Sequence, residues 1–468
     1  MTLIKSISGI RGTIGGKPDE GLSPVDIVRF TSAYGTWLQK NKTDKLKVVI
    51  GRDARISGEM VSNIVVGTLQ GLGIDVIDLG FSTTPTVEVA VPMENADGGI
   101  ILTASHNPKQ WNALKLLNNK GEFISGEDGS ELLEIAEANA FNYADVDDLG
   151  GYTKDDSYLE KHIQSILAMD LVDVEAIKRK NYKVAIDCVN STGGIFLPAL
   201  LQALGVTNII ELYCEPNGQF PHNPEPLPEN LTEISKQIKA QGADVGFVVD
   251  PDVDRLCMVC ENGEMFGEEY TLVAVADYIL KHTKGNTVSN LSSTRALRDV
   301  TEKNGGKYFA SAVGEVNVVN MMKTNSAVIG GEGNGGIIYP ASHYGRDALV
   351  GIALFLTHFA KSEFDTCSAL RASYPDYYIS KNKIQLTPEI DVDDILVKMA
   401  EKYSNEDVNT IDGVKINFAE EWVHLRKSNT EPIIRIYSES KSMGDADALA
   451  NKIIGEIKQI SNQEQVVN

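Results

Sequence analysis

Three aspartates, Asp250, Asp252 and Asp254, alternate with other residues in the stretch Asp-Pro-Asp-Val-Asp-Arg. If the backbone is extended here, the three carboxylates point to the same side. Negative charges this close repel one another unless a cation lies among them, and a ligand set made only of oxygens suits Mg²⁺ better than zinc. The stretch therefore predicts a magnesium site, with an acidic turn or a helix cap as the alternative.

Ser105 is the candidate nucleophile of the chain. It lies in Thr-Ala-Ser-His-Asn-Pro, residues 103–108, directly after an apolar run that predicts a strand. Ligands of open α/β sheets bind at the carboxyl ends of strands, where this hydroxyl would lie. A serine followed by asparagine and proline is also typical of a turn or a cap. His106 is expected to be a hydrogen-bonding spacer rather than a base.

Two further loops carry polar groups. Residues 426–432, Arg-Lys-Ser-Asn-Thr-Glu-Pro, combine arginine, hydroxyls and backbone N–H groups, which suits a phosphate monoester; a solvated basic turn is the alternative. Residues 331–336, Gly-Glu-Gly-Asn-Gly-Gly, formally satisfy the GxGxxG pattern. A dinucleotide loop must open a helix, whereas strand-like apolar residues follow this one, so we reject a dinucleotide site here.

The elements that must position these residues occur three times. Short buried strands are predicted from Leu46, Tyr182 and Asn286, each followed by a helix-length stretch, a second strand and a third strand. This βαβ spacing predicts parallel pairing, with helices on both faces of each sheet. Aligning the third strands of the first two repeats places Ser105 opposite Asp252, so corresponding strand ends carry a hydroxyl in one repeat and carboxylates in the next.

The fold class predicted is α/β, with three similar α/β domains of mixed, mostly parallel sheets and a C-terminal α+β domain, around a central cleft. The pattern changes to antiparallel character after about residue 370. The predicted boundaries place the Ser105 domain at 1–154, the aspartate domain at 155–256, a third domain at 257–370 and the fourth at 371–468.

Composition restricts the classes of function. A chain of 468 residues is long for one core, and its net charge of −22 argues against nucleic acid or an anionic membrane as a partner. No apolar run approaches the length of a membrane span. The five cysteines form no disulfide framework, and Cys257 and Cys260 fit a buried strand better than a zinc site. We therefore expect a soluble, cytoplasmic protein.

Six motifs, in order along the whole chain, resemble signatures of the α-D-phosphohexomutase family, which includes phosphoglucomutases, phosphomannomutases and phosphoglucosamine mutases. They are SGIRG at 8–12, GRDARISG at 51–58, TASHNP at 103–108, DPDVDR at 250–255, GEGNGG at 331–336 and RKSNTEP at 426–432. The resemblance implies an isomerase that interconverts hexose 6-phosphate and hexose 1-phosphate through phospho-Ser105. A hexose 1,6-bisphosphate intermediate would turn end for end between the two transfers.

The resemblance also implies the roles of individual residues. Mg²⁺ would be bound by phospho-Ser105 and the three aspartates, while Lys115 and Arg11 would manage proton transfer and His106 would assist orientation. The substrate-binding residues would be Arg255 near the metal, Glu332 and Asn334 at the sugar hydroxyls, and Arg426, Ser428, Asn429 and Thr430 at the non-reacting phosphate.

The resemblance leaves the preferred sugar open. The Glu-x-Asn-Gly form of the 331–336 loop looks more like archaeal-type phosphoglucosamine mutases, because glucose and mannose enzymes usually have serine at the position of Asn334. Ser292 replaces a lysine that many glucose and mannose enzymes have. We therefore rank glucosamine phosphate first, with glucose or mannose phosphate as the alternative. A hydrolase, or a phosphosugar-binding regulator without catalysis, are further alternatives; intact Ser105 and the aspartates argue against the regulator.

Overall fold

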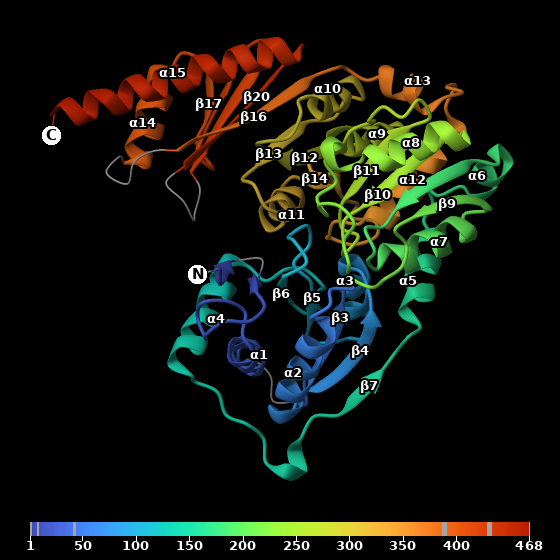
Figure 1. Ribbon diagram of the computed structural model, residues 1–468, viewed down its shortest axis with the longest axis vertical. Helices are drawn as coiled ribbons and strands as arrows, with labels where there is room; N and C mark the ends of the chain where they lie inside the picture. The colour runs from blue at the N-terminus through green and yellow to red at the C-terminus, as the bar shows by residue number, and fades with distance from the viewer. Residues whose placement is uncertain (1, 7–8, 41–43, 386–390, 428–432, 468) are drawn as a thin grey trace. The chain divides into compact units, whose positions relative to one another are not determined.

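The computed structural model describes residues 2–6, 9–40, 44–385, 391–427 and 433–467, with side chains described as far as residue 460. Its ribbon is drawn in Figure 1. Contacts divide the chain into two compact units. The first unit is Met1–Ile279 with Asn334–Arg371, and the second is Leu280–Gly333 with Ala372–Asn468.

The first unit begins with a seven-stranded sheet in the order β1-β2-β6-β5-β3-β4-β7. Strand β3 pairs in parallel with both β4 and β5, whereas β5 pairs with β6 in antiparallel fashion. The strands are β1 (Ile4–Ser6), β2 (Gly9–Thr13), β3 (Lys47–Arg52), β4 (Asp75–Phe81), β5 (Gly98–Leu102), β6 (Trp111–Leu117) and β7 (Tyr152–Lys154).

Four helices belong to this part of the chain: α1 (Pro24–Gln39), α2 (Gly58–Gly71), α3 (Thr84–Met93) and α4 (Gly126–Ala138). Helix α1 begins at a capping box, in which the Ser23 hydroxyl and the Asp26 carboxylate satisfy each other's backbone N–H groups, and Pro24 occupies the first turn. Apolar residues of α1, α2, α4 and the strands form one buried cluster. This cluster fixes the sheet from which Ser105 extends.

The second sheet of the first unit repeats the central order of the first, as β11-β10-β8-β9. Strand β8 pairs in parallel with β9 and β10, and β10 pairs antiparallel with β11. The strands are β8 (Lys183–Asp187), β9 (Asn208–Leu212), β10 (Val245–Val249) and β11 (Leu256–Cys260). Cys257 and Cys260 are buried free thiols in β11, as the sequence predicts.

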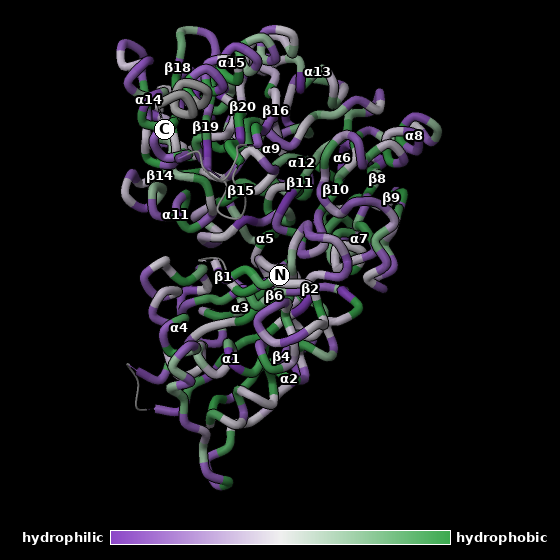
Figure 2. Tube along the Cα trace, turned by 60° about the vertical axis from the view of Figure 1, so that its left-hand side comes forward, coloured by the Kyte–Doolittle hydropathy of each residue, from purple (hydrophilic) through white to green (hydrophobic). Residues whose placement is uncertain are grey.

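The helices that accompany this sheet are α5 (Tyr158–Leu167), α6 (Val174–Lys180), α7 (Gly193–Ala203), α8 (Thr232–Gln241) and α12 (Ala348–Lys361). Helix α12 is buried along almost its whole length and contacts α5, α6, α7 and β11. Figure 2 shows hydrophobic stretches concentrated in strands and helices, whereas the connecting loops are mostly hydrophilic. The short strand β15 (Gly336–Ile338) also belongs to the first unit.

The second unit contains the third repeat and the C-terminal sheet. In the repeat, β12 (Asn286–Asn290) pairs in parallel with β13 (Tyr308–Ser311) and β14 (Ala327–Glu332), accompanied by α10 (Ala296–Lys303) and α11 (Glu315–Thr324). Helix α9 (Glu268–His282) precedes the repeat, and α13 (Cys367–Ala372) precedes the C-terminal sheet.

The C-terminal sheet is antiparallel throughout, in the order β16-β20-β19-β18-β17. Its elements are β16 (Tyr378–Gln385), α14 (Val392–Lys402), β17 (Asp407–Asn409), β18 (Val414–Asn417), β19 (Trp422–Lys427), β20 (Ile433–Ser440) and α15 (Met443–Val467). Buried aliphatic residues of α14, α15 and the strands form its core.

The predicted fold class is confirmed in its secondary structure and strand pairing: three α/β repeats with mixed sheets are followed by an antiparallel α+β segment. Within the described part of the chain, no helix has both the length and the apolar character that crossing a membrane requires.

Candidate active site

Ser105 lies in the turn that follows β5. Its backbone has a φ of 48°, in the left-handed region that a serine rarely occupies. The side chain is largely buried, and Oγ donates a hydrogen bond of 2.7 Å to Asp250 Oδ2. The ends of β5 and β10, which the sequence predicts to correspond, therefore bring the hydroxyl and the first aspartate into direct contact.

Arg55 holds the turn of Ser105 in place. Its guanidinium donates to four backbone carbonyls of that turn, those of Ser105 at 2.5 Å, Asn107 at 2.7 Å, Pro108 at 2.8 Å and Trp111 at 2.9 Å. Arg55 is fully buried, and its Nε lies 3.0 Å from Asp53 Oδ2. The same carboxylate oxygen accepts a hydrogen bond of 2.7 Å from the Thr103 hydroxyl.

The three aspartates do converge, but not because the backbone is extended. Residues 250–253 form a tight turn in which the Val253 N–H donates to the Asp250 carbonyl, and Val253 has a φ of 62°. Asp250 Oδ1 accepts the backbone N–H groups of Asp254 and Arg255 at 3.2 and 3.1 Å. The expected extended stretch is therefore wrong; the first carboxylate folds the loop around itself through these N–H groups.

The aspartates form a group that can bind a metal ion. One oxygen from each carboxylate lies within 4.8 Å of the others, and all three residues are buried. Asp252 Oδ1 and Asp254 Oδ1 are buried and accept no hydrogen bond within the described residues. Burial, together with the charges of Asp254 and Asp252, raises the pKa of Asp250 well above its ordinary value. Orphaned buried oxygens and mutual repulsion both fit a hard cation at this position.

Two cations contact the same carboxylates. Lys115 Nζ on β6 lies 2.6 Å from Asp252 Oδ2 and 3.3 Å from Asp254 Oδ2, and Arg346 Nη2 lies 2.7 Å from Asp254 Oδ2. Burial alone would lower the pKa of Lys115, but Asp252 and Asp254 raise it above its ordinary value. Burial would likewise raise the pKa of Asp254, but Arg346 and Lys115 hold it below its usual range. Lys115 is therefore an ammonium here.

Arg11 and Arg255 add to this positive surround, whereas His106 is uncharged. Burial and then the charge of Arg255 lower the pKa of His106 to about 2, so the imidazole is neutral. Its Nδ1 lies 3.4 Å from Ser105 Oγ, which suits orientation rather than strong proton transfer. Burial and the charge of Arg255 also lower the pKa of Arg11. Arg255 is largely buried and lies about as far from Asp250 as from Asp254, at 4.0 and 3.9 Å.

The remaining predicted site residues are described within their own units. In the first unit, the half-buried Asn334 accepts the Gly336 N–H at 3.1 Å, which shapes the 331–336 loop. In the second unit, buried Glu332 accepts from Asn290 Nδ2 at 2.9 Å and the Gly314 N–H at 3.1 Å. Arg426, also there, pairs with Asp412 at 2.8 Å. Ser428, Asn429 and Thr430 lie outside the described residues.

Four residues of the site received no role from the sequence. Arg55 and Asp53 lie in the GRDARISG motif, which resembles a family signature, but the resemblance assigned no role to either residue. Thr84, whose hydroxyl donates to Asp252 Oδ2 at 2.5 Å, carried no sequence signal. Arg346 lies in Gly-Arg-Asp-Ala at 345–348, which repeats the first four residues of GRDARISG, so an internal comparison of the sequence could have found it.

Comparisons with known proteins match the whole chain. Models of the phosphoglucomutase/phosphomannomutase family match in order: alpha/beta/alpha domain I at residues 3–143, domain II at 157–263, domain III at 267–377 and the C-terminal domain at 385–456.

Relatives of known name and a solved structure match the same family as these models. A phosphoglucomutase/phosphomannomutase of Thermococcus kodakarensis is 37% identical over 437 residues, covering 92% of this chain and 94% of that protein. A phosphoglucosamine/phosphogalactosamine mutase of Sulfurisphaera tokodaii is 32% identical over 462 residues, covering 97% of each. The crystal structure of a phosphoglucomutase/phosphomannomutase family protein from Burkholderia thailandensis, 26% identical, covers 98% of both chains with a TM-score of 0.84. The chain therefore belongs to the phosphoglucomutase/phosphomannomutase family of phosphohexomutases.

Proposed function

We propose that this phosphohexomutase acts through phospho-Ser105 and that its preferred substrate is glucosamine phosphate. The observation that carries the proposal is the 2.7 Å contact between Ser105 Oγ and Asp250, inside a ring of buried cations. Phosphoryl transfer depends mainly on positioning and on stabilisation of charge. The aspartate turn and the cations around Ser105 supply both.

Mg²⁺ is the cation that we propose for Asp250, Asp252 and Asp254, with an oxygen of phospho-Ser105 as a further ligand. When bound, Mg²⁺ neutralises charge on the phosphoryl group and on the departing serine oxygen. The protein's own part is to keep the three carboxylates buried and fixed, through backbone N–H groups to Asp250 and the Thr84 hydroxyl to Asp252.

Proton transfer is assigned to Lys115 and Arg11, with His106 orienting the serine. In the first transfer the Ser105 Oγ–P bond breaks and an O–P bond forms to a hydroxyl of the hexose phosphate. That hydroxyl loses a proton and Ser105 Oγ gains one. Because Lys115 is an ammonium beside the carboxylates, it is placed to give a proton to the departing serine oxygen and to regain one from the attacking hydroxyl, so the ammonium is restored for the return transfer from the bisphosphate.

Binding of the sugar is assigned to Arg255, Glu332 and Asn334, and binding of the non-reacting phosphate to Arg426, Ser428, Asn429 and Thr430. Support for glucosamine comes from Asn334 and from Ser292, whose hydroxyl pairs with His424 Nδ1 at 2.9 Å. The Sulfurisphaera relative is named for phosphoglucosamine and phosphogalactosamine, whereas the Thermococcus relative is named for glucose and mannose phosphates. Hexose 1,6-bisphosphate is the proposed intermediate and activator.

The proposal extends to organisation and location. We assign four domains at 1–154, 155–256, 257–370 and 371–468, and a cytoplasmic enzyme that takes a small phosphosugar rather than nucleic acid or membrane as its partner. The net charge of −22 supports this choice of partner.

A competition between substrates tests the proposal. Turnover is compared on glucosamine 6-phosphate, glucose 1-phosphate and mannose 1-phosphate, each with Mg²⁺ and a trace of the matching bisphosphate. We expect the highest kcat/KM with glucosamine 6-phosphate; a higher value with glucose or mannose phosphate would keep the mechanism and overturn the substrate.

The same assay separates the other classes of function. Product is analysed both for the isomerised sugar phosphate and for inorganic phosphate. Inorganic phosphate as the main product would make the protein a hydrolase, and binding of phosphosugar without turnover would make it a regulator. Incubation with the bisphosphate should leave one phosphate on Ser105, detected by peptide mass spectrometry.

A further inference from the structure

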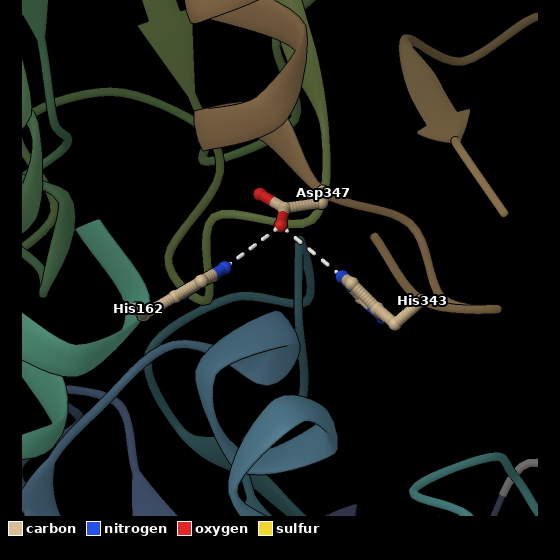
Figure 3. A group of neighbouring side chains, drawn as sticks. All are labelled: His162, His343 and Asp347. Atoms are coloured by element: carbon tan, nitrogen blue, oxygen red, sulfur yellow. Dashed lines mark hydrogen bonds and ion pairs between the residues drawn. The ribbon is translucent and has the colours of Figure 1, made fainter. Parts of the chain in front are cut away.

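A second cluster of potential metal ligands lies in the first unit, apart from the aspartate turn. It consists of His162 on α5, His343 in the loop before α12, and Asp347 at the start of α12, and it is drawn in Figure 3. One ligand atom from each residue lies within 4.8 Å of the others. His162 Nε2 and His343 Nε2 each lie 3.1 Å from the same oxygen, Asp347 Oδ2. His162 and Asp347 are almost completely buried.

The far nitrogen of each imidazole also has a partner. His162 Nδ1 lies 2.8 Å from the Thr86 hydroxyl, and His343 Nδ1 lies 3.4 Å from Glu88 Oε2. Both partners are buried on α3. Histidines that bind a metal through one nitrogen commonly donate the other N–H to a hydroxyl, carbonyl or carboxylate, which fixes the ring. The arrangement has this form at His162, whereas at His343 the Glu88 carboxylate lies at ion-pair distance and forms no hydrogen bond to Nδ1.

Gly345 makes room for the arrangement. A Cβ at this position would lie 1.8 Å from Glu88 Oε2 and 2.9 Å from His343 Cε1. Any other residue would force the carboxylate away from the imidazole. The backbone at Gly345 therefore permits the close approach of a buried glutamate to a histidine, which a simple loop between β15 and α12 does not require.

We propose that His162, His343 and Asp347 bind a second divalent metal ion, of the zinc class, through the two Nε2 atoms and Asp347 Oδ2. Two imidazoles and one carboxylate are ligands that zinc prefers, whereas magnesium prefers oxygen alone. Ligands about 2.0–2.1 Å from a tetrahedral ion are about 3.3 Å apart, close to the separations of 3.1 Å found here.

A bound ion also fixes where the proton of a neutral His343 lies. A neutral imidazole has a single N–H. If His343 donates it from Nε2 to Asp347, then Nδ1 presents a lone pair to the Glu88 carboxylate. A metal at Nε2 leaves the proton on Nδ1, where Glu88 accepts it. The ion also neutralises two buried carboxylates, Asp347 and Glu88, which an isolated pair of neutral histidines does not.

The proposed site is structural and supports the aspartate turn. Asp347 Oδ1 caps α12 by accepting the N–H groups of Leu349 and Val350 at 2.8 and 3.1 Å, so Oδ2 remains for the ion. The preceding residue, Arg346, donates to Asp254, and the Ala348 N–H donates to the Val253 carbonyl. Zinc would thus join α3, α5 and the start of α12 behind the turn that holds Asp252 and Asp254.

The first test measures metal content in the full-length wild-type protein. The chain is stripped with a chelator, reloaded with Zn²⁺ in excess Mg²⁺ so that the aspartate turn is occupied, and desalted. We expect about one zinc per chain, with X-ray absorption showing two imidazole nitrogens in its ligand shell. No retained zinc, or zinc with oxygen ligands only, would overturn the proposal without the need for any variant.

Variants then assign the site. His343→Ala should abolish zinc retention, and Glu88→Gln should weaken zinc affinity roughly 10- to 100-fold through the lost imidazole partner. Asp252→Asn, in the other cluster, and His282→Ala, exposed at the end of α9, should retain wild-type zinc. Zinc lost with Asp252→Asn but kept with His343→Ala would place the ion on the aspartates and refute the second site. The readout is independent of mutase activity, so the proposed function can fail or hold separately.

Discussion

The turns after β5 and β10 are equivalent in the repeat but are held by different sets of groups. Both follow a fully buried five-residue strand, and both contain a residue in the left-handed region, Ser105 at 48° and Val253 at 62°. The Ser105 turn is held from outside, by the Arg55 guanidinium on its carbonyls. The N–H groups of the aspartate turn are held from within, on Asp250 Oδ1, and its carbonyls accept from other elements: Pro251 from the Ser191 and Thr192 hydroxyls, Asp252 from the Thr84 N–H, and Val253 from the Ala348 N–H.

The difference follows from what each turn must leave available. A hydroxyl that exchanges a phosphoryl group needs a fixed backbone and a free side chain, so the fixing charge comes from another element. Carboxylates that share a cation need their outer oxygens free, and Asp250 can use its second oxygen to fold the loop. Strain at both turns costs on the order of 1–3 kcal/mol and persists because surrounding contacts determine the conformation.

Removing the hydroxyl is expected to have the largest effect. Ser105→Ala should lower turnover by about 10⁴-fold or more, because no other group in the first turn can carry the phosphoryl group. The thermal unfolding midpoint should stay close to that of the wild type, since the change removes only one hydroxyl and leaves the backbone contacts of the turn in place. The matched control is Ser130→Ala, an exposed serine on α4, which should turn over normally. Wild-type turnover in Ser105→Ala would end the phosphoserine proposal.

Removing one charge from the aspartate turn should have the second-largest effect on turnover. Asp252→Asn keeps the shape of the side chain but deletes a proposed ligand charge, so kcat should fall by about 10²- to 10³-fold and the Mg²⁺ concentration for half-maximal activity should rise. Titrating Mg²⁺ against activity measures both. Asp147→Asn, exposed in the short 3₁₀ helix at 146–148, serves as control. Undiminished activity at ordinary Mg²⁺ would contradict the metal assignment.

Removing the external clamp tests whether the first turn depends on Arg55. Arg55→Ala leaves Asp53 buried without its partner and frees four carbonyls, which should lower the free energy of unfolding by about 3–5 kcal/mol. A displaced Ser105 should also lower kcat by about 10²-fold. Urea unfolding and turnover are the measurements, with Arg52→Ala, at the end of β3 just before the loop that contains Arg55, as the control. If stability and turnover are both unchanged, contacts other than those of Arg55 hold the first turn.

The smallest expected effect depends on pH and concerns the free energy of unfolding. It arises because positive charges lie around Ser105 and His106. Burial and the charge of Arg255 lower the pKa of His106 from its ordinary value of 6.5 to about 2 in the folded protein. As the pH falls below 6.5 the unfolded chain takes up a proton that the folded state does not, so His106 lowers stability toward acid. His106→Gln removes this loss, and between pH 6.5 and 4.5 its advantage in the free energy of unfolding should grow by about 2–3 kcal/mol.

The pH experiment is best done in Ser105→Ala protein, where no phosphate can form beside the imidazole. Urea unfolding is measured at a series of pH values with and without the His106→Gln change. If the difference in the free energy of unfolding between the two proteins stays constant across this range, His106 is protonated in the folded state as readily as in the unfolded state. The surroundings of Ser105 would then be less positive than their geometry indicates.

Local sequence determined the repeated strands and helices, the antiparallel C-terminal segment and the chemical type of each loop. Hydrophobic periodicity and residue type act over short separations, so these features can be predicted without a partner segment. The sequence also showed that GRDARISG resembles a family motif, but it did not show that Arg55 binds the carbonyls of the Ser105 turn.

Tertiary structure alone decided which side chains meet. Ser105 and Asp250 are 145 residues apart, Thr84 and Asp252 are 168 apart, and His162 and Asp347 are 185 apart. The turn at Asp250 also departed from the extended backbone that alternation predicted, because a carboxylate that accepts two N–H groups stabilises a fold that periodicity does not describe. Contacts between distant segments depend on how sheets and helices pack, and no local pattern specifies that packing.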